Sequence, residues 1–343
     1  MHKSSAELLT CCGIDVSALQ LAVAVQTEDA RCWQRGFPNR ASGHRALIVW
    51  LQKIGGRVRV CLEATGLYSL DLALALHAAS GIEVAVLNPK TANRFAATLC
   101  RSKTDPADAQ VLCEYARRMP FQLWQPPSSI ALQLRALTRH IAALAQQHTR
   151  DSNRLRAVSA SIAGSGCVRQ DLQRSLRQLQ HRAEKMRAAA LALIQQDAEL
   201  RPRFALLLSM PGIGEISALH LLGELALLAP GLSVRQWVAH SGLDPAHHES
   251  GSSVRKPARI SRAGNRYLRR ALYMPALVAV RHDPHLRAFY QTLLARHKAK
   301  LQALMAVARK MLRAIFGMFR WRSDYDGSRL LPKIELPALA AVA

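Results

Sequence analysis

The chain has 343 residues, of which 47 are Lys or Arg and 23 are Asp or Glu, giving a formal net charge of +24. So basic a chain is expected to bind a polyanion, and nucleic acid is the first candidate. We identify no apolar run long enough to span a bilayer and no cleavable signal in "MHKSSAELLT", so we expect no membrane partner and a location in the bacterial cytoplasm.

The basic excess is uneven along the chain. Residues 1–120 hold 14 basic and 10 acidic side chains, whereas residues 121–343 hold 33 and 13. The acids therefore concentrate where the basic excess is smallest, which indicates two parts with different roles. The seven cysteines include no Cys-x-x-Cys pair, which favours reduced thiols over a disulfide framework or a zinc site.

The first 125 residues show the pattern of a mixed α/β domain. Residues 11–26 are predicted to form a strand and residues 31–37 a second strand that pairs with it. A helix over 42–54 with Ser42 as a candidate cap, a strand over 57–63, a helix over 67–80 and a strand over 81–87 follow. After residue 104 the pattern predicts another helix through Met119. A hairpin followed by alternating helices and strands predicts an α/β sheet of modest size.

The remainder is predicted to be all-α. Pro126 and Pro127 indicate a linker, and residues 126–204 show helical leucine spacing with a break at 163–168. Two long helices are expected there, either folded back on each other as a coiled coil or paired between chains. Residues 205–325 form a further helical segment, and residues 326–343 are expected to be a poorly ordered tail. The arginines of the long helices fit a solvated face or nucleic-acid contact equally well.

Two aspartates, Asp105 and Asp108, stand three residues apart in the segment "RSKTDPADAQVL". Their simplest explanation is helix capping, with Asp105 as the N-cap, Pro106 as the first helical residue and Asp108 at the third position. Two further acids change that balance, because Asp15 lies within an apolar strand and Glu63 ends an alternating strand. A carboxylate on a strand is disfavoured and, if buried, costly to leave charged and unpaired.

The four acids would converge if the two strands are neighbours and the helix begins across their ends. Such a cluster raises its own pKa values unless cations lie within it. Carboxylate oxygens suit Mg²⁺, with Mn²⁺ as a substitute, and a two-metal site suits phosphodiester chemistry. We therefore predict that Asp15, Glu63, Asp105 and Asp108 are catalytic and bind metal.

A second candidate site lies in the segment "HHESGSSVRKPARISRAGNRYLRR". Its residues 255–270 carry no acid and seven basic side chains: Arg255, Lys256, Arg259, Arg262, Arg266, Arg269 and Arg270. Such a run is typical of phosphate binding without sequence readout. Ser250, Ser252 and Ser253 either donate hydrogen bonds to phosphates or include a nucleophile, and His247 and His248 have no assigned role. The turn "MPGIG" either grips a DNA backbone or joins two helices tightly.

These segments resemble a known family. The chain resembles the insertion-sequence transposases of the IS-one-ten type, also called bridge-RNA-guided recombinases, in "GIDVS", "CLEATGLY", "KTDPADA", "MPGIG", "SGLDP" and "ESGSSVRKPARISRAGNRYLRRALYMP". The resemblance runs from about Cys12 to Phe319, and the block around Ser250 is its most specific part.

The resemblance implies an RNase H-like, Holliday-junction-resolvase-like domain over residues 1–125 with a DEDD set at Asp15, Glu63, Asp105 and Asp108. It also implies a helical transposase domain over 205–325 whose nucleophile is Ser250, forming a 5′-phosphoserine link to DNA. The expected partners are donor and target DNA, a structured guide RNA, and further copies of the chain as a dimer to tetramer. Two rival interpretations are a Mg²⁺-dependent resolvase-type nuclease that uses activated water, and a non-catalytic nucleic-acid-binding scaffold.

Overall fold

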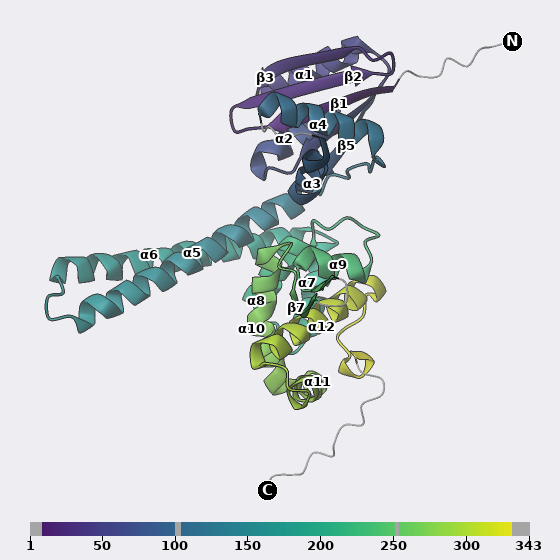
Figure 1. Ribbon diagram of the computed structural model, residues 1–343. Helices are drawn as coiled ribbons and strands as arrows, with labels where there is room; N and C mark the ends of the chain where they lie inside the picture. The colour runs from purple at the N-terminus through teal and green to yellow at the C-terminus, as the bar shows by residue number, and fades with distance from the viewer. Residues whose placement is uncertain (1–8, 100–103, 251–253, 331–343) are drawn as a thin grey trace, which may run out of the picture. The chain divides into compact units, whose positions relative to one another are not determined.

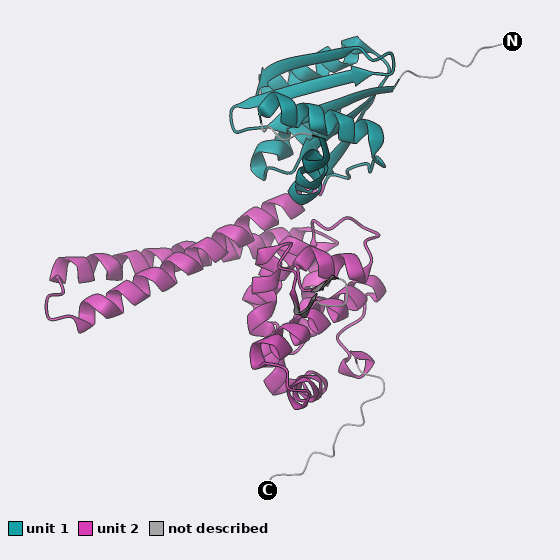
Figure 2. Cartoon of the chain, viewed as in Figure 1, with its two compact units in different colours: residues 1–126 teal, residues 127–343 magenta. Residues whose placement is uncertain are grey.

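The computed structural model describes residues 9–99, 104–250 and 254–330. The chain divides into two compact units, residues 1–126 and residues 127–343 (Figure 2). No helix within the described ranges combines the length and apolar character that a membrane crossing requires.

The first unit is built on a five-stranded sheet. Its elements are β1 (Leu9–Val16), β2 (Gln20–Thr27), β3 (Cys32–Pro38), α1 (Ala41–Ile54), β4 (Arg57–Glu63), α2 (Leu67–His77), β5 (Ile82–Leu87), α3 (Pro89–Leu99) and α4 (Asp105–Arg118). The strand order is β3-β2-β1-β4-β5. The strands β1, β2 and β3 form an antiparallel meander, whereas β4 and β5 run parallel to β1. The predicted mixed α/β unit is confirmed.

The two faces of this sheet have different cores. Cys12, Ile14 and Val16 alternate along β1 with Cys11, Gly13 and Asp15, so the two sets lie on opposite faces. The first set belongs to a core of large aliphatic residues shared with α1 and α2. Cys11 instead belongs to a second core of small residues, which includes Ala109 and Cys113 of α4. Small side chains allow α4 to pack closely on β1 (Figure 1).

Three local predictions in this unit differ from the structure. The single strand expected over 11–26 is two strands, because Ser17–Leu19 form a turn in which the Ser17 hydroxyl donates to the carbonyl oxygen of Gln20. Helix α1 begins at Ala41 with Arg40 at its cap position, so Ser42 is not its cap. Helix α4 is capped by Thr104, whose hydroxyl accepts from the amide of Ala107, and not by Asp105.

The second unit consists mainly of helices. Its elements are α5 (Ser129–Ala160), α6 (Gly166–Gln196), α7 (Leu200–Ser209), α8 (Glu215–Leu225), α9 (Val234–Ser241), β6 (Pro245–Ser250), β7 (Val254–Ile260), α10 (Arg266–His282), α11 (Pro284–Ala295), α12 (Lys300–Trp321) and the 3₁₀ helix η1 (Gly327–Leu330). Helices α5 and α6 fold back on each other within one chain and pack along their length. Their core is continued by α7 to α12, where α12 buries eight residues.

Two features of this unit were not foreseen from the sequence. Residues 245–260 form an antiparallel β-hairpin within a region expected to be helical. Pro257 is accommodated on β7 because the pairing shifts there, and a proline lacks the amide that regular pairing needs. The expected tail begins with the 3₁₀ helix η1, and residues 331–343 lie outside the described residues.

The "MPGIG" turn joins α7 to α8. Gly212 has a positive φ of 90°, and a Cβ there would lie 2.6 Å from the carbonyl oxygen of Pro275 in α10. The turn therefore packs against α10 at the point where Pro275 interrupts the helical hydrogen bonds. This contact supports the tight helix-to-helix turn, one of the two interpretations of the motif.

Candidate active site

The candidate active site is assembled at the carboxyl ends of β1 and β4. These parallel strands pair in register as far as Ile14 and Leu62, and the next residues along are Asp15 and Glu63. Equivalent residues of adjacent parallel strands point to the same face of the sheet. Asp15 and Glu63 therefore lie side by side on the face that α4 covers, and both side chains are half-buried.

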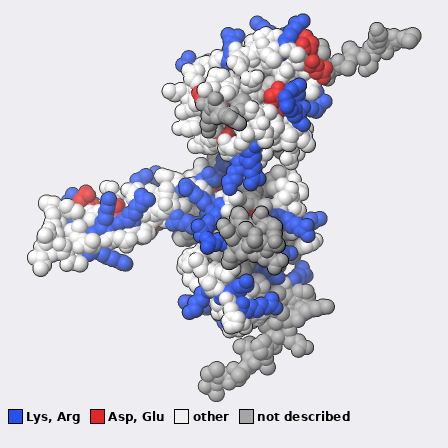
Figure 3. Space-filling view, viewed as in Figure 1, with Lys and Arg blue, Asp and Glu red and all other residues white. Residues whose placement is uncertain are grey.

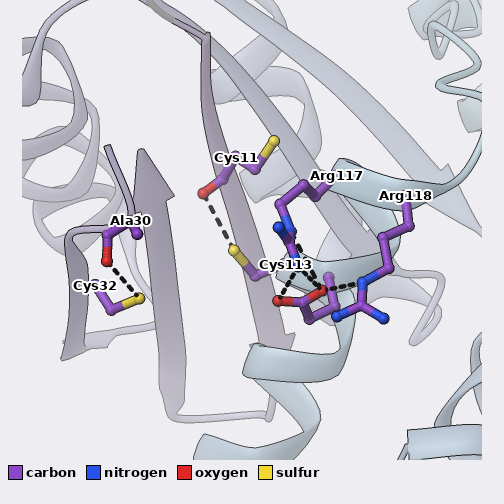
Figure 4. Close-up of polar contacts among 7 residues, drawn as sticks. Cys11, Ala30, Cys32, Cys113, Arg117 and Arg118 are labelled. Carbon is purple, nitrogen blue, oxygen red and sulfur yellow. Dashed lines mark hydrogen bonds and ion pairs between the residues drawn. The ribbon is translucent and has the colours of Figure 1, made fainter. Parts of the chain in front are cut away.

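Helix α4 runs antiparallel to β1 in a fixed register. The thiol of Cys113 donates to the carbonyl oxygen of Cys11 at 3.2 Å (Figure 4). One helical turn earlier, the backbone oxygen of Ala109 lies 2.1 Å from the position a Cβ would take on Gly13. Four residues of a helix span about 6 Å and two residues of a strand span about 6.6 Å. Every fourth residue of α4 therefore lies opposite every second residue of β1. This register brings Asp105 to Asp15 at the next step.

A cavity of about 390 Å³ lies at that next step. Asp15, Asp105 and Pro106 line it together with residues of β2 and β3, including Gln34 and Arg35. The structure thus brings together two of the four predicted acids. Arg35 was missed from the sequence because its short strand gave no sign of which residues it would face.

Asp105 and Asp108 lie in the first turn of α4. Because Thr104 caps the helix, Asp105 has no capping role and its side chain is exposed. Asp108 is half-buried one turn from the cap. Carboxylates are favoured here by the partial positive charge of the helix N-terminus. The capping explanation therefore does not account for Asp105.

The full four-acid metal cluster stays a prediction. In the described ranges, no three side chains of His, Cys, Asp or Glu are close enough together to hold one metal ion. Asp15 and Asp105 share a cavity, Glu63 follows Asp15 in register on β4, and Asp108 follows Asp105 on α4. All of these ligands offer carboxylate oxygen, which fits Mg²⁺ and does not fit a soft metal.

The second predicted site lies on the β6–β7 hairpin. Ser250 is the last residue of β6 and pairs with Val254, while Ser252 and Ser253 lie outside the described residues. His247 and His248 are also on β6, and Arg255, Lys256 and Arg259 are on β7. The serine thus lies at the end of a hairpin whose opposite strand carries basic residues.

The other four basic residues of 255–270 lie after the hairpin, at or near the start of α10. Arg262, Arg266 and Arg270 are exposed, which suits contact with phosphates. Arg269 is half-buried and donates from Nη1 to the carbonyl oxygen of Ser241 at 2.8 Å. Burial and the nearby charge of Arg262 lower the pKa of Arg269. Arg269 therefore braces the end of α9, a structural role that the sequence did not indicate.

A buried carboxylate fixes the start of α10. Glu224 of α8 accepts from Arg139 of α5 at 2.7 and 2.9 Å and from Asn265 at 2.5 Å. Burial alone would raise the pKa of Glu224, but the hydrogen bonds from Arg139 and Asn265 bring it below its ordinary value. Asn265 also caps α10 by accepting from the amides of Tyr267 and Leu268. This network orients the basic segment that follows the serine hairpin.

Sequence comparisons match both units. A family model described as "Transposase" matches residues 12–162, and a model described as "Transposase IS116/IS110/IS902 family" matches residues 204–291. The pilin gene-inverting protein of Moraxella bovis is 30% identical over 308 residues, covering 86% of this chain and 91% of that protein. The chain belongs to the IS116/IS110/IS902 transposase family.

Other relatives of the transposase are a second pilin gene-inverting protein and a protein of an insertion element. The pilin gene-inverting protein of Moraxella lacunata is 29% identical over 331 residues, which is 92% of this chain and 98% of that protein. An insertion element IS110 protein of Streptomyces coelicolor is 32% identical over 154 residues, covering 45% and 38% of the two chains. The family resemblance seen in the sequence is thereby confirmed, and the enzyme is a DNA transposase or recombinase.

The two family matches cover both candidate sites of the transposase. The first match includes Asp15, Glu63, Asp105 and Asp108 and continues through α5 to the turn before α6. The second includes Ser250 and all seven basic residues of 255–270. The particular role of each residue stays a prediction.

Proposed function

We propose that this transposase cuts and rejoins DNA strands with Ser250 as its nucleophile and with Asp15, Glu63, Asp105 and Asp108 as its acid centre. The observation that carries this proposal is the antiparallel register of α4 on β1, which delivers Asp105 and Asp15 to one cavity. A structural role alone gives no reason for two carboxylates to face the same cavity in so basic a protein.

The acid centre is proposed to hold Mg²⁺, with Mn²⁺ as a substitute. Asp15 and Asp105 would hold the ion directly, and Glu63 and Asp108 would complete the ligand set. When bound, the ion neutralises charge on the phosphate being attacked. Arg35, which lines the same cavity, would hold a phosphate oxygen of the strand near these carboxylates.

The proposed cleavage step is a transesterification. The Oγ of Ser250 loses its proton and forms a bond to phosphorus, the bond from phosphorus to the 3′ oxygen breaks, and the 3′ oxygen takes up a proton. The product is a 5′-phosphoserine link and a free 3′-hydroxyl. Rejoining is the reverse, in which the 3′-hydroxyl of the exchanged strand attacks the link and releases Ser250. Exposed guanidinium groups, such as those of Arg262 and Arg266, would stabilise the charge on the phosphate.

The sheet of the first unit supports an RNase H-like fold. Three antiparallel strands followed by two parallel ones, in the order β3-β2-β1-β4-β5, place the acids at the carboxyl ends of the central strands. We propose that the unit is an RNase H-like catalytic domain, and that the hairpin of α5 and α6 is the coiled coil through which copies of the chain associate.

The partners we propose are donor and target DNA and a structured guide RNA, bound by a dimer or tetramer that is associated with the bacterial nucleoid when active. The basic excess supports nucleic-acid binding, and groups of Lys and Arg side chains are distributed over the visible face of both the α5–α6 hairpin and the helical body of the second unit (Figure 3). RNA guidance rests on the family resemblance. The name of two relatives, pilin gene-inverting protein, supports rearrangement of DNA segments.

Denaturing electrophoresis tests this proposal. Labelled DNA that carries the ends of the element is incubated with Mg²⁺, the transcript of its non-coding end, and either wild type, Ser250→Ala, Ser252→Ala or Ser253→Ala. We expect a protein–DNA adduct that survives denaturation, disappears in Ser250→Ala and persists in the two matched controls. Cleavage without an adduct that Ser250→Ala leaves intact but Asp105→Asn abolishes would indicate a water-using nuclease instead. Binding without cleavage in every variant would indicate a scaffold.

A further inference from the structure

A second cavity of the first unit lies at the same edge of the sheet as the acids. Its volume is about 580 Å³, and three segments surround it: the β1–β2 turn, the junction of β3 with α1, and the start of α2. The residues that line it include Arg40, His44, Arg45, Tyr68 and Asp71. Neither the acid centre nor the serine hairpin contributes a residue to its walls.

Asn39 fastens the three segments together. Its Nδ2 donates to the carbonyl oxygen of Ser17 at 2.8 Å and to that of Tyr68 at 3.1 Å. Its backbone amide donates to the carbonyl oxygen of Leu19 at 2.8 Å. Because the amide nitrogen is used as a donor, Oδ1 faces Nε2 of the buried His44 at 2.8 Å, and the imidazole N–H donates. The cavity is therefore rigidly built and not a gap between loose loops.

The cavity presents cationic and aromatic groups to solvent. Arg40 and Arg45 are exposed, and neither forms an ion pair with any described residue. By contrast, Arg57 and Arg59 on β4 both pair with Glu83. Tyr68 is 57% exposed although it is a large aromatic residue.

This combination matches a single nucleic-acid strand. Guanidinium groups hold phosphates, and an exposed ring offers a face on which an unpaired base stacks. Asp71 is the one acid among the residues that line the cavity, so the net charge of Asp71 and the two arginines is positive. A duplex does not present its base faces in this way, whereas an unpaired strand does.

We propose that this cavity binds a nucleotide of the unpaired DNA strand that enters the acid centre, with the base on Tyr68 and the flanking phosphates on Arg40 and Arg45. This inference rests on the proposed function of the acid centre. Ser17, which Asn39 fixes, is two residues beyond Asp15, so a strand held here continues around the sheet edge towards Asp15. The commitment to DNA follows because the cut strand is the one that reaches the acids.

Photocrosslinking locates such a strand residue by residue. The probe is a short single-stranded oligothymidylate with one central 5-iodo-2′-deoxyuridine, irradiated with the full-length Ser250→Ala protein and mapped by tryptic mass spectrometry. We expect an adduct at Tyr68, in the peptide that follows Arg59 and ends at Lys90. Because Ser250→Ala forms no phosphoserine link, failure here is distinct from failure of the proposed nucleophile.

Matched variants test the role of the arginines. In an Arg40→Gln, Arg45→Gln double variant we expect the Tyr68 adduct to fall by at least about threefold. We also expect the slope of log Kd against log salt to drop by about 1.4, which is about 0.7 for each phosphate of a single strand that an arginine no longer neutralises. Arg31→Gln is the control, because Arg31 is exposed but already pairs with Asp29 at the β2–β3 turn. Circular dichroism verifies that each variant is folded.

Three results would overturn the proposal. They are an absence of crosslinking at Tyr68, an adduct unaffected by the arginine changes, and a stronger adduct with the matching oligouridylate or with duplex DNA than with the single DNA strand.

Discussion

Gly13 sets how closely α4 approaches β1, so Gly13→Ala is a direct perturbation of the proposed acid centre. A Cβ at this position would lie 2.1 Å from the carbonyl oxygen of Ala109 and 2.1 Å from the amide nitrogen of Cys113. Both are backbone atoms of α4 and cannot rotate away. The helix must therefore move as a body, and it carries Asp105 and Asp108 in its first turn.

The expected magnitudes follow from that geometry. Ordinary contact begins at 3.4 Å, so α4 must retreat by about 1.3 Å from the strand. Overpacking of this kind lowers the free energy of unfolding by about 1–3 kcal/mol. A displacement of about 1 Å between catalytic groups reduces the rate of a positioned reaction by about 100-fold. We therefore expect Gly13→Ala to be folded and destabilised, with a far larger loss of activity than of stability.

Two measurements check this prediction, urea denaturation and the initial rate of adduct formation with element-end DNA. Gly166→Ala is the control, because Gly166 is the first residue of α6, far from the acid centre in sequence, and a Cβ there meets no atom within 4 Å. Its free energy of unfolding should change by no more than about 0.5 kcal/mol. The reasoning is refuted if Gly13→Ala reacts at the wild-type rate or if Gly166→Ala is equally impaired.

Three further predictions concern charge and thiol chemistry. Burial lowers the pKa of His44 below its ordinary value of about 6.5, so the unfolded state binds more protons than the folded state. The free energy of unfolding should therefore fall as the pH drops below about 6.5. Urea titrations of wild type and His44→Gln at several pH values measure this fall, and an equal fall in both proteins would contradict the prediction. Arg139→Leu leaves the carboxylate of Glu224 buried without its cation and should lower the free energy of unfolding. The expected decrease is about 2 kcal/mol, because solvent around the partly exposed Arg139 weakens the ion pair. An unchanged midpoint of urea denaturation would argue against the network. Among the described thiols only Cys32 and Cys167 are exposed, so these two should react rapidly with a disulfide reagent at neutral pH while the buried ones react only on unfolding.

The two strand acids were readable from sequence, because an acid within an apolar strand or at the end of an alternating strand is a local pattern. Asp15 and Glu63 were found in this way, and the parallel pairing of their strands confirmed that they are neighbours. The register of α4 was not readable, since it depends on a contact between Cys113 and Cys11 that spans 102 residues. The small residues Gly13 and Ala109 were its only sequence signal.

Local capping and turn chemistry explains the other differences. Asp105 was predicted as the cap because aspartate and the following proline are both typical of a helix start. Thr104 competes for the same position and takes it, which moves Asp105 into the helix. The β6–β7 hairpin was missed because a strand interrupted by Pro257 reads as a loop, and only the irregular pairing opposite it permits the strand. The contact of Arg269 with Ser241 was not predicted, because it is set by the tertiary packing of α9 against α10.

The central claim is that Asp15 and Asp105 act together as metal ligands in the cavity they share. Electron paramagnetic resonance of added Mn²⁺ measures bound ion directly, in the full-length Ser250→Ala protein with single-stranded DNA present, and so does not depend on turnover. We predict that Asp15→Asn and Asp105→Asn each abolish the bound signal, whereas Asp29→Asn, at the exposed β2–β3 turn, leaves it unchanged. Undiminished Mn²⁺ binding in both Asp15→Asn and Asp105→Asn would contradict the account.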